Sequence, residues 1–302
     1  MLAIMFSQND LPSGGNSGRP RFKVATVCRV LEVSRSGFYD WSAKLFAPSK
    51  ATLRRQELVV QIREVFNESR NTYGSRRVHA ELTLGRGIQV SLGSIEKLMR
   101  IEAIAGVPTK RKWRRKNTSA TAGDLLNRNF DRGEINQVWV TETTQHNTRE
   151  GVLYCAAVLD TNSRKIVGWS IDSNQTSKLV TGALDMAVKS RNPVGTVIHS
   201  DHGSQYVSWA FSQKIKDSGL APSMGTVGDG YDNAPMESFW GRMQTELLNT
   251  KSWSTRAELA SAIFSYIEIF HNRQRRHSSL GYLTPVEYEN LKILTSAGVG
   301  NG

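Results

Sequence analysis

The chain has 302 residues, is 39% hydrophobic, and carries 39 Lys and Arg against 27 Asp and Glu, a net charge of +12. This length allows two or three domains with a sizeable core. Two cysteines, Cys28 and Cys155, are too few for a disulfide framework and match no metal-site spacing. No apolar run approaches the roughly 18 residues that a membrane span needs, and the apolar stretch at residues 1–6 is too short for a signal peptide. We therefore expect a cytoplasmic protein with no membrane partner.

Positive charge is concentrated in the first third of the chain. Residues 1–117 hold 22 Lys and Arg and 9 Asp and Glu, a net charge of +13, whereas residues 118–302 hold 17 and 18, a net charge of −1. Such asymmetry favours a phosphate-binding module joined to a near-neutral one. A basic surface that serves only solubility is the alternative.

Helical periodicity begins after a polar tail at residues 1–20, which is rich in Gly, Ser, Asn and Pro and is predicted to be disordered. Either Ser34 or Ser36 can cap the second of two short helices. Two helices joined by a tight turn are typical of a helix-turn-helix, although an ordinary helical hairpin gives the same pattern. The apolar stripe that indicates the first helix consists of Val24, Val27, Cys28, Leu31 and Val33.

A long helix and a second helix-turn-helix-like stretch are predicted next. The helix covers residues 51–68 and turns Leu53, Leu58, Ile62 and Phe66 toward a core. Arg76 and Arg77 precede a glycine-containing break at residues 85–87, and Ser91 can cap the helix that follows. Residues 21–117 therefore read as an all-α DNA-binding region.

A basic run at residues 110–116 closes this region and surrounds Trp113. Runs of like charge are often only solvated tails. An aromatic ring among cations is also typical of nucleic-acid clamps, because bases stack on it. We expect a linker over residues 118–134 and phosphate contacts from Lys110, Arg111, Lys112, Arg114 and Arg115.

From residue 137 the apolar period becomes that of strands. Three strands in an antiparallel meander are followed by alternating helices and strands, which predicts an α/β mixed sheet with the RNase H-like outline. Thr284 and Glu287 flank Pro285 as a capping box for a last helix. We place this α/β core at residues 135–290, with a tail at 291–302. The strands are expected at 138–147, 152–159, 165–171, 196–200 and 221–224, and the helices at 177–189, 209–218, 232–240 and 256–270.

Three acids lie where strands and a helix can bring them together. Glu142 is within the first strand, Asp201 follows the fourth, and Glu237 lies in the first turn of a helix, 36 positions after Asp201. A turn aspartate and a glutamate favoured by the helix dipole are the alternatives for Asp201 and Glu237. Carboxylate oxygens suit Mg²⁺, and two such ions about 4 Å apart can clamp the attacking and leaving oxygens of a phosphodiester. The acids predict phosphoryl transfer on nucleic acid.

Five segments together resemble the bacterial insertion-sequence transposases of the second-reading-frame (orf B) type, which have a retroviral-integrase-like DDE catalytic core. They lie at residues 139–142, 158–169, 199–206, 228–240 and 271–282. The resemblance implies an RNase H-like core, two Mg²⁺ or Mn²⁺ ions, and end-binding modules in the amino-terminal region. It also implies that one strand is hydrolysed at the element end and that the freed 3′-hydroxyl attacks a second phosphodiester. Glu142, Asp201 and Glu237 are then the catalytic and metal-binding residues.

Glu142 departs from the family pattern, which has Asp at this position. The added methylene moves the carboxylate by roughly 1.5 Å, and a misplacement near 1 Å can cost about 10²-fold in rate. In a hairpin that turns near residue 150, Asp160 falls opposite Trp139, about 10 Å from Glu142 at about 3.3 Å per residue. Asp160 is therefore expected to be a turn residue and not a substitute acid.

Two other functions compete with a DNA transposase: a catalytically impaired DNA-binding regulator of transposition, which Glu142 favours, and an RNase H-like nuclease that cuts without joining. The expected partners are double-stranded DNA of the element ends and the target, further copies of the chain assembled on DNA, and a protein from an upstream reading frame. Besides the basic run, the residues predicted to bind DNA are Arg76, Arg77, Arg242, Arg273, Arg275 and Arg276.

Overall fold

The structure is a computed structural model that describes residues 23–107, 133–201, 203–224 and 234–298. The chain divides into two compact units, Met1–Val60 and Gln61–Gly302, and the division falls within helix α3 (Lys50–Glu68). The basic run at 110–116, most of the linker at 118–134 and the tail at 1–20 lie outside the described residues. Within those residues, no helix combines the length and the apolar character that crossing a membrane requires.

The first unit contains the two predicted short helices, α1 (Val24–Val30) and α2 (Arg35–Phe46). Ser34 is the residue that caps α2, because its Oγ accepts from the backbone N–H of Gly37 at 3.0 Å. Cys28 is the buried residue of α1, whereas Val33 is 38% exposed. The helix pair is confirmed, although its apolar stripe is only partly buried.

The second unit begins with a helical segment, residues 61–107, that packs around the end of α3. It comprises α4 (Ser75–Ala80), a π-helical turn η3 (Glu81–Gly85) and α5 (Leu92–Ile101). As predicted, Ser91 caps α5, since its Oγ accepts from the N–H of Ser94 at 3.3 Å. The buried face of α3 consists of Ile62 and Val65, while Leu53 is 45% exposed. The prediction that Leu53 belongs to the core face is therefore wrong.

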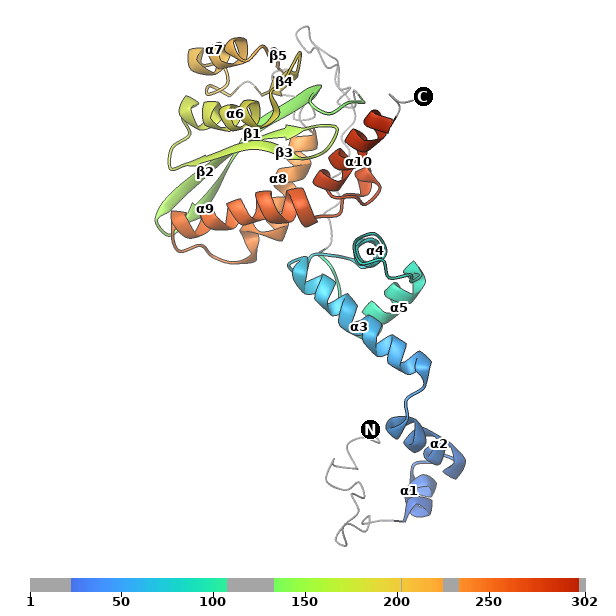
Figure 1. Cartoon of the computed structure of the whole chain (residues 1–302). Coiled ribbons are helices and arrows are strands. Elements are labelled where there is room, and N and C mark those ends of the chain that lie inside the picture. Colours follow the sequence, from blue (N-terminus) through green and yellow to red (C-terminus); the bar gives the residue numbers. More distant parts are fainter. Residues whose placement is uncertain (1–22, 108–132, 202, 225–233, 299–302) are drawn as a thin grey trace, which may run out of the picture. The chain divides into compact units, whose positions relative to one another are not determined.

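A five-stranded mixed sheet with the order β3-β2-β1-β4-β5 forms the centre of the second unit (Figure 1). The first three strands pair in an antiparallel meander, and β4 and β5 add in parallel on the other side of β1. This arrangement confirms the α/β mixed sheet. The strands are β1 (Val138–Thr148), β2 (Gly151–Asp160), β3 (Ile166–Asp172), β4 (Val197–Ser200) and β5 (Ala221–Met224).

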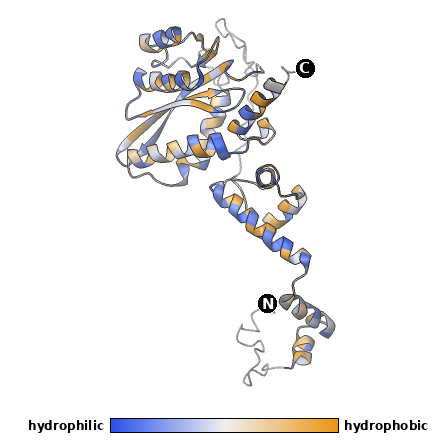
Figure 2. Ribbon diagram, viewed as in Figure 1, coloured by the Kyte–Doolittle hydropathy of each residue, from blue (hydrophilic) through white to orange (hydrophobic). Residues whose placement is uncertain are grey.

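Helices cover both faces of the sheet. One layer contains α6 (Ser177–Arg191) and α7 (Trp209–Asp217), and the other contains α8 (Ala234–Glu246) and α9 (Arg256–Phe264) (Figure 1). The helices carry hydrophobic and hydrophilic bands (Figure 2), as expected when one side faces a sheet. A Cβ on Gly168 would collide with the backbone of Ala183 and Ala187, so glycine allows β3 to approach α6 closely.

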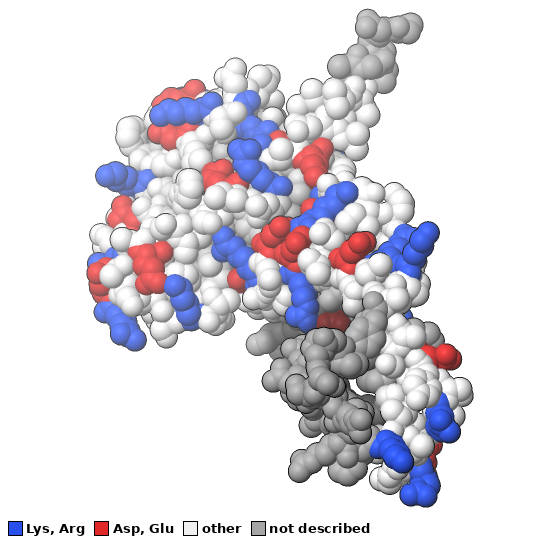
Figure 3. Space-filling model, turned by 60° about the horizontal axis from the view of Figure 1, so that its bottom comes forward, with Lys and Arg blue, Asp and Glu red and all other residues white. Residues whose placement is uncertain are grey.

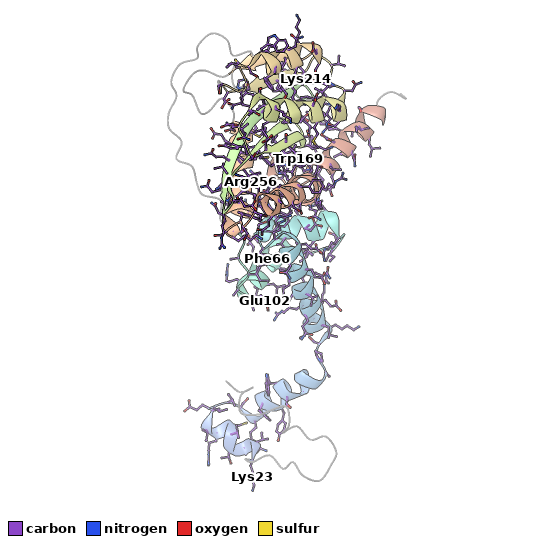
Figure 4. The ribbon with its side chains drawn as sticks, turned by 90° about the vertical axis from the view of Figure 1, so that its left-hand side faces the viewer. Lys23, Phe66, Glu102, Trp169, Lys214 and Arg256 are labelled. Atoms are coloured by element: carbon purple, nitrogen blue, oxygen red, sulfur yellow. The ribbon has the colours of Figure 1, made fainter. Side chains whose placement is uncertain are left out.

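A π-helical segment, η5 (Ser265–Gln274), continues α9 and closes the core on that side. It is joined to the sheet by Trp169 of β3 (labelled in Figure 4), which donates its ring N–H to Glu268 at 2.8 Å. A single 3₁₀ turn follows α8 at η4 (Leu248–Thr250), and another, η6 (Ser278–Leu280), precedes the last helix.

The last helix, α10 (Pro285–Gly298), begins at the predicted capping box. Thr284 Oγ1 accepts from the N–H of Glu287 at 3.2 Å, and Glu287 Oε2 accepts from the N–H of Thr284 at 2.9 Å. The helix continues past residue 290, where the sequence places the start of a tail, because Glu289 ties it to the core through ion pairs with Lys165 and Arg191.

Candidate active site

Glu142 and Asp201 lie side by side where β4 ends against β1, two inner strands of the sheet. β1 and β4 are parallel, and their last paired residues are Thr141 and Ser200. An acid follows each of these residues, Glu142 within β1 and Asp201 directly after β4, and neighbouring strands are about 4.8 Å apart. Asp201 is exposed, and its Oδ1 accepts from the N–H of Gly203 at 3.0 Å. The two first predicted acids are thus neighbours because of the strand register.

A buried tyrosine lies beneath this pair. Tyr206 is 1% exposed, and its hydroxyl lies 3.4 Å from Oγ1 of Thr141. Burial raises the pKa of Tyr206, and the negative charges of Asp201 and Glu142 raise it further. The phenol therefore stays neutral and can donate a hydrogen bond next to the two carboxylates.

Glu237 is carried by α8, which contacts β1. Its helix buries Met236, Trp240 and Met243, the stripe predicted from the sequence, and Glu237 itself is half-buried at the edge of that stripe. Within the described residues, no three His, Cys, Asp or Glu side chains lie close enough together to hold a metal ion. The expected convergence of all three acids is therefore not formed in this structure. Residues 225–233, which immediately precede α8, and His202 lie outside the described part of the chain.

The donor chemistry of the site nevertheless suits hard divalent cations. Glu142 and Asp201 provide carboxylate oxygens on adjacent strands, and Mg²⁺ is usually held by one or two carboxylates together with waters and substrate phosphates. The two neighbouring acids meet that minimum without Glu237.

Asp160 has the structural role predicted for it. It pairs with Trp139 across the β1–β2 hairpin and is completely buried. Its carboxylate accepts from the backbone N–H groups of Asn136, Asn162 and Ser163, at 2.6, 2.9 and 3.0 Å. These bonds close the turn after β2, so Asp160 does not replace Glu142.

Two of the residues predicted to bind DNA are buried against carboxylates in this structure. Arg275 is 1% exposed and forms an ion pair with Glu246, and Arg276 is 3% exposed and forms ion pairs with Glu81 and Glu287. A guanidinium that is buried against carboxylates cannot reach a DNA phosphate. The sequence signal failed here because three arginines within four residues, 273, 275 and 276, favour a solvated segment, whereas Arg275 and Arg276 follow η5 directly and are buried.

The other predicted DNA-binding arginines retain exposed surface. Arg76 and Arg273 are exposed, and Arg77 and Arg242 are half-buried. Over the face that Figure 3 shows, Lys and Arg are mixed with Asp and Glu and form no single basic patch. DNA contact at these residues stays a prediction.

The buried hydrogen-bonding group that holds α8 to η5 was not predicted. Glu246 accepts from the Tyr266 hydroxyl at 2.7 Å and from Nε of Arg275 at 2.9 Å. Burial alone would raise the pKa of Glu246, but the hydrogen bonds from Arg275 and Tyr266 hold it below its usual value. No local sequence pattern indicates this group, because Tyr266 and Arg275 follow Glu246 by 20 and 29 positions.

Family models match most of the described chain. Two models of an integrase core domain match residues 133–229 and 218–285, and a model of an HTH-like domain matches residues 53–112. The matches coincide with the mixed sheet and with the helical segment that precedes it.

Curated relatives match nearly the whole chain. The transposase for insertion sequence element IS629 of Shigella sonnei is 35% identical over 94% of this chain and 96% of its own length. The IS600 uncharacterized 31 kDa protein of Shigella sonnei is 40% identical over 87% and 97%. Transposase InsF for insertion sequence IS3A of Escherichia coli K12 is 32% identical over 90% and 96%.

A solved structure gives a weaker match. The HTLV-2 integrase catalytic core domain in complex with magnesium aligns with 51% of this chain and 95% of its own, at 16% identity and a TM-score of 0.38. The family assignment rests on the sequence relatives alone.

Proposed function

The chain belongs to the transposases of bacterial insertion sequences, and from this membership we propose that it cuts and joins DNA with Glu142, Asp201 and Glu237 as its catalytic acids. The observation that supports the proposal is the register of β1 and β4, which sets Glu142 beside Asp201 at the carboxyl end of β4 in the integrase-type sheet. Glu237 enters from α8, the helix that contacts β1.

Each residue of the site has a defined task in this proposal. Glu142 and Asp201 would hold Mg²⁺ or Mn²⁺, and Glu237 would complete the donor set from the helix. The ions, when bound, neutralise charge on the phosphodiester and favour in-line displacement. Tyr206 supports the floor of the site and remains a hydrogen-bond donor, since its pKa is raised by burial and by the two neighbouring acids. The partners are duplex DNA of the element ends and the target, further copies of this chain, and an upstream-frame protein.

A catalytically impaired regulator of transposition is the second candidate. It is favoured by Glu142, which carries one methylene more than the aspartate of the family pattern. Such a protein would bind the element ends but would not cleave them.

The test is the variant Glu142→Asp, compared with the unchanged protein on an intact and a pre-nicked duplex of the element end. If Glu142 overreaches, the variant should cleave and join strands about 10²-fold faster in Mg²⁺, because the shorter side chain restores the position of the carboxylate. Mn²⁺ should reduce the difference, being somewhat less strict in geometry.

Three outcomes are distinguishable in this assay. Faster cleavage by Glu142→Asp supports the transposase assignment and the stated role of the first acid. Equal cleavage by both proteins means that the site has adapted to glutamate. Tight binding of the end without cleavage by either protein favours the regulator.

A further inference from the structure

Three arginines of the second unit lie close to the buried Glu246 or to residues next to it. Arg242 precedes Glu246 by one helical turn on α8, so both side chains project from the same side of that helix. Arg77 of α4 donates from Nε to the carbonyl oxygen of Arg276 at 3.1 Å. Arg70 donates to Oγ of Ser265 at 2.9 Å. We call Arg70, Arg77 and Arg242 the arginine cluster.

The charge of this arginine cluster is not neutralised within the described part of the chain. Glu246 is already paired with Arg275 through two hydrogen bonds, and no ion pair with any described carboxylate involves Arg70, Arg77 or Arg242. A buried N–H group of Arg275, on Nη1, also has no acceptor among the described residues. The region around Glu246 therefore holds more guanidinium groups than its described carboxylates can pair.

Holding these cations together is unfavourable in the free protein. Burial lowers the pKa of all three arginines, that of Arg242 to about 10, and the neighbouring arginines lower those of Arg77 and Arg242 further. Aromatic rings relieve part of the cost: Arg70 lies 5.3 Å from the ring centre of Phe270, and Arg77 lies 5.8 Å from that of Tyr73. Arg242 has no such ring contact among the described residues.

We propose that the arginine cluster binds a backbone phosphate of DNA, between the HTH-like helices and the helix that carries Glu237. Guanidinium groups match the oxygens of a phosphate in geometry and charge, and each bond is stronger than a neutral one. This inference rests on the proposed DNA-joining function. It also separates Arg77 and Arg242, which retain exposed surface, from the buried neighbours Arg275 and Arg276.

The position on α8 relates this phosphate to the catalytic centre. Arg242 follows Glu237 by five residues, which corresponds to about 7.5 Å along the helix axis. That rise equals about two nucleotides of B-form DNA. Five residues also rotate about 140° around the helix, so the two side chains leave α8 in different directions. The arginine cluster would thus hold a phosphate about 1.4 helical turns from Glu237 along α8, and α4 would contact the same strand from the HTH-like side.

The test measures binding of a fluorescein-labelled DNA duplex to the full chain over a series of salt concentrations. Arg242→Gln should weaken binding by about tenfold at low salt. It should also reduce the slope of log affinity against log salt by about one, because one phosphate contact is lost. Arg77→Gln should do the same, and the double variant should lose about two units of slope.

Arg256→Gln is the matched control. Arg256 lies at the start of α9 (Figure 4) and donates from Nε to the carbonyl of Val152 at 3.0 Å, as Arg77 does to that of Arg276. Its removal should leave the salt slope unchanged. Thermal unfolding separates a structural role from a binding role, since Arg242→Gln removes repulsion and should unfold at the same temperature or higher.

An unchanged salt slope in Arg242→Gln would overturn the inference, and a lowered unfolding temperature with unchanged binding would assign Arg242 to structure instead. Failure of the proposed function looks different, because it would show as intact, salt-dependent binding of the duplex without strand cleavage.

Discussion

Two aspartates of the catalytic core have opposite surroundings, although both lie at the carboxyl end of a strand. Asp201 is exposed beside Glu142 after β4, whereas Asp160 is completely buried at the end of β2. Burial raises the pKa of Asp160, although the N–H groups of Ser163 and Asn136 oppose the shift. The exposed carboxylate of Asp201 can bind ions from solvent, whereas the buried carboxylate of Asp160 stabilises the fold.

We expect the variants Asp201→Asn and Asp160→Asn to differ in both metal binding and stability. Asp201→Asn should remove most of the Mn²⁺ binding measured by calorimetry and should hardly change unfolding. Asp160→Asn should leave Mn²⁺ binding unchanged and should lower the free energy of unfolding by about 1–3 kcal/mol, because an amide cannot accept all three backbone N–H bonds. Equal Mn²⁺ affinity of Asp201→Asn and the unchanged protein would place the metal site elsewhere.

At the scale of elements, η5 and the residues after it form an unexpected part of the core. His271 and His277 are each 2% exposed, and their ring centres are 5.0 Å apart. Burial lowers the pKa of His271 to about 3 and that of His277 well below its usual value. Both imidazoles are therefore neutral in the folded protein, and this region is sensitive to acid.

The unfolding free energy should accordingly decrease as the pH falls below about 6.5, the usual pKa of an unfolded histidine. Above that pH both states are neutral and the full stability is present. Below it the unfolded chain binds protons that the folded protein does not, which costs about 1.4 kcal/mol per pH unit for each buried histidine. Denaturant unfolding between pH 7 and pH 5 should show a slope that His277→Gln reduces by this amount.

A control for this slope is Thr284→Ala, which removes the cap of α10 and should cost about 1 kcal/mol at every pH. It destabilises the same unit without changing a titrating group. If both variants shift the pH dependence equally, buried His277 is not its cause.

At the scale of the whole molecule, the described chain forms two compact units, and adjacent arginines join parts of the second. Arg275 binds Glu246 of α8, while Arg276 binds Glu81 of the HTH-like segment and Glu287 of the α10 capping box. The hydroxyl of Tyr73, in the HTH-like segment, accepts from the N–H of Arg276 and donates to the carbonyl of Gln274. The HTH-like segment and the catalytic core are thus held together by buried polar groups.

Removing one partner of the buried Arg275–Glu246 pair should be strongly destabilising. Arg275→Met leaves the Glu246 carboxylate buried without its cation and should cost about 3–5 kcal/mol. Arg275→Met combined with Glu246→Leu should recover part of that loss, because neither charge is then left buried alone. The more exposed pair Arg63–Glu102, whose side chains are 55% and 27% exposed, is the comparison. Arg63→Met should cost no more than about 1 kcal/mol in the same denaturant unfolding experiment.

The sequence by itself determined the elements and their order. Strand and helix periodicity located the meander, and the hairpin register that places Asp160 opposite Trp139 could be counted from the turn. The caps at Ser91 and Thr284 were also readable, and the first cap was narrowed to Ser34 or Ser36, because capping depends on residues three positions apart. The three candidate acids were found in the same way, from local motifs.

Only the tertiary structure decided which charged residues are buried. Arg275 and Arg276 lie in a run of cations that local composition assigns to solvent, yet their partners Glu246, Glu81 and Glu287 come from three separate elements. Local patterns carry no information about such pairs, because the partners meet only when the helical segment, α8 and α10 close around η5. The parallel pairing of β1 with β4, which sets Glu142 beside Asp201, is long-range in the same sense and follows from packing between distant strands.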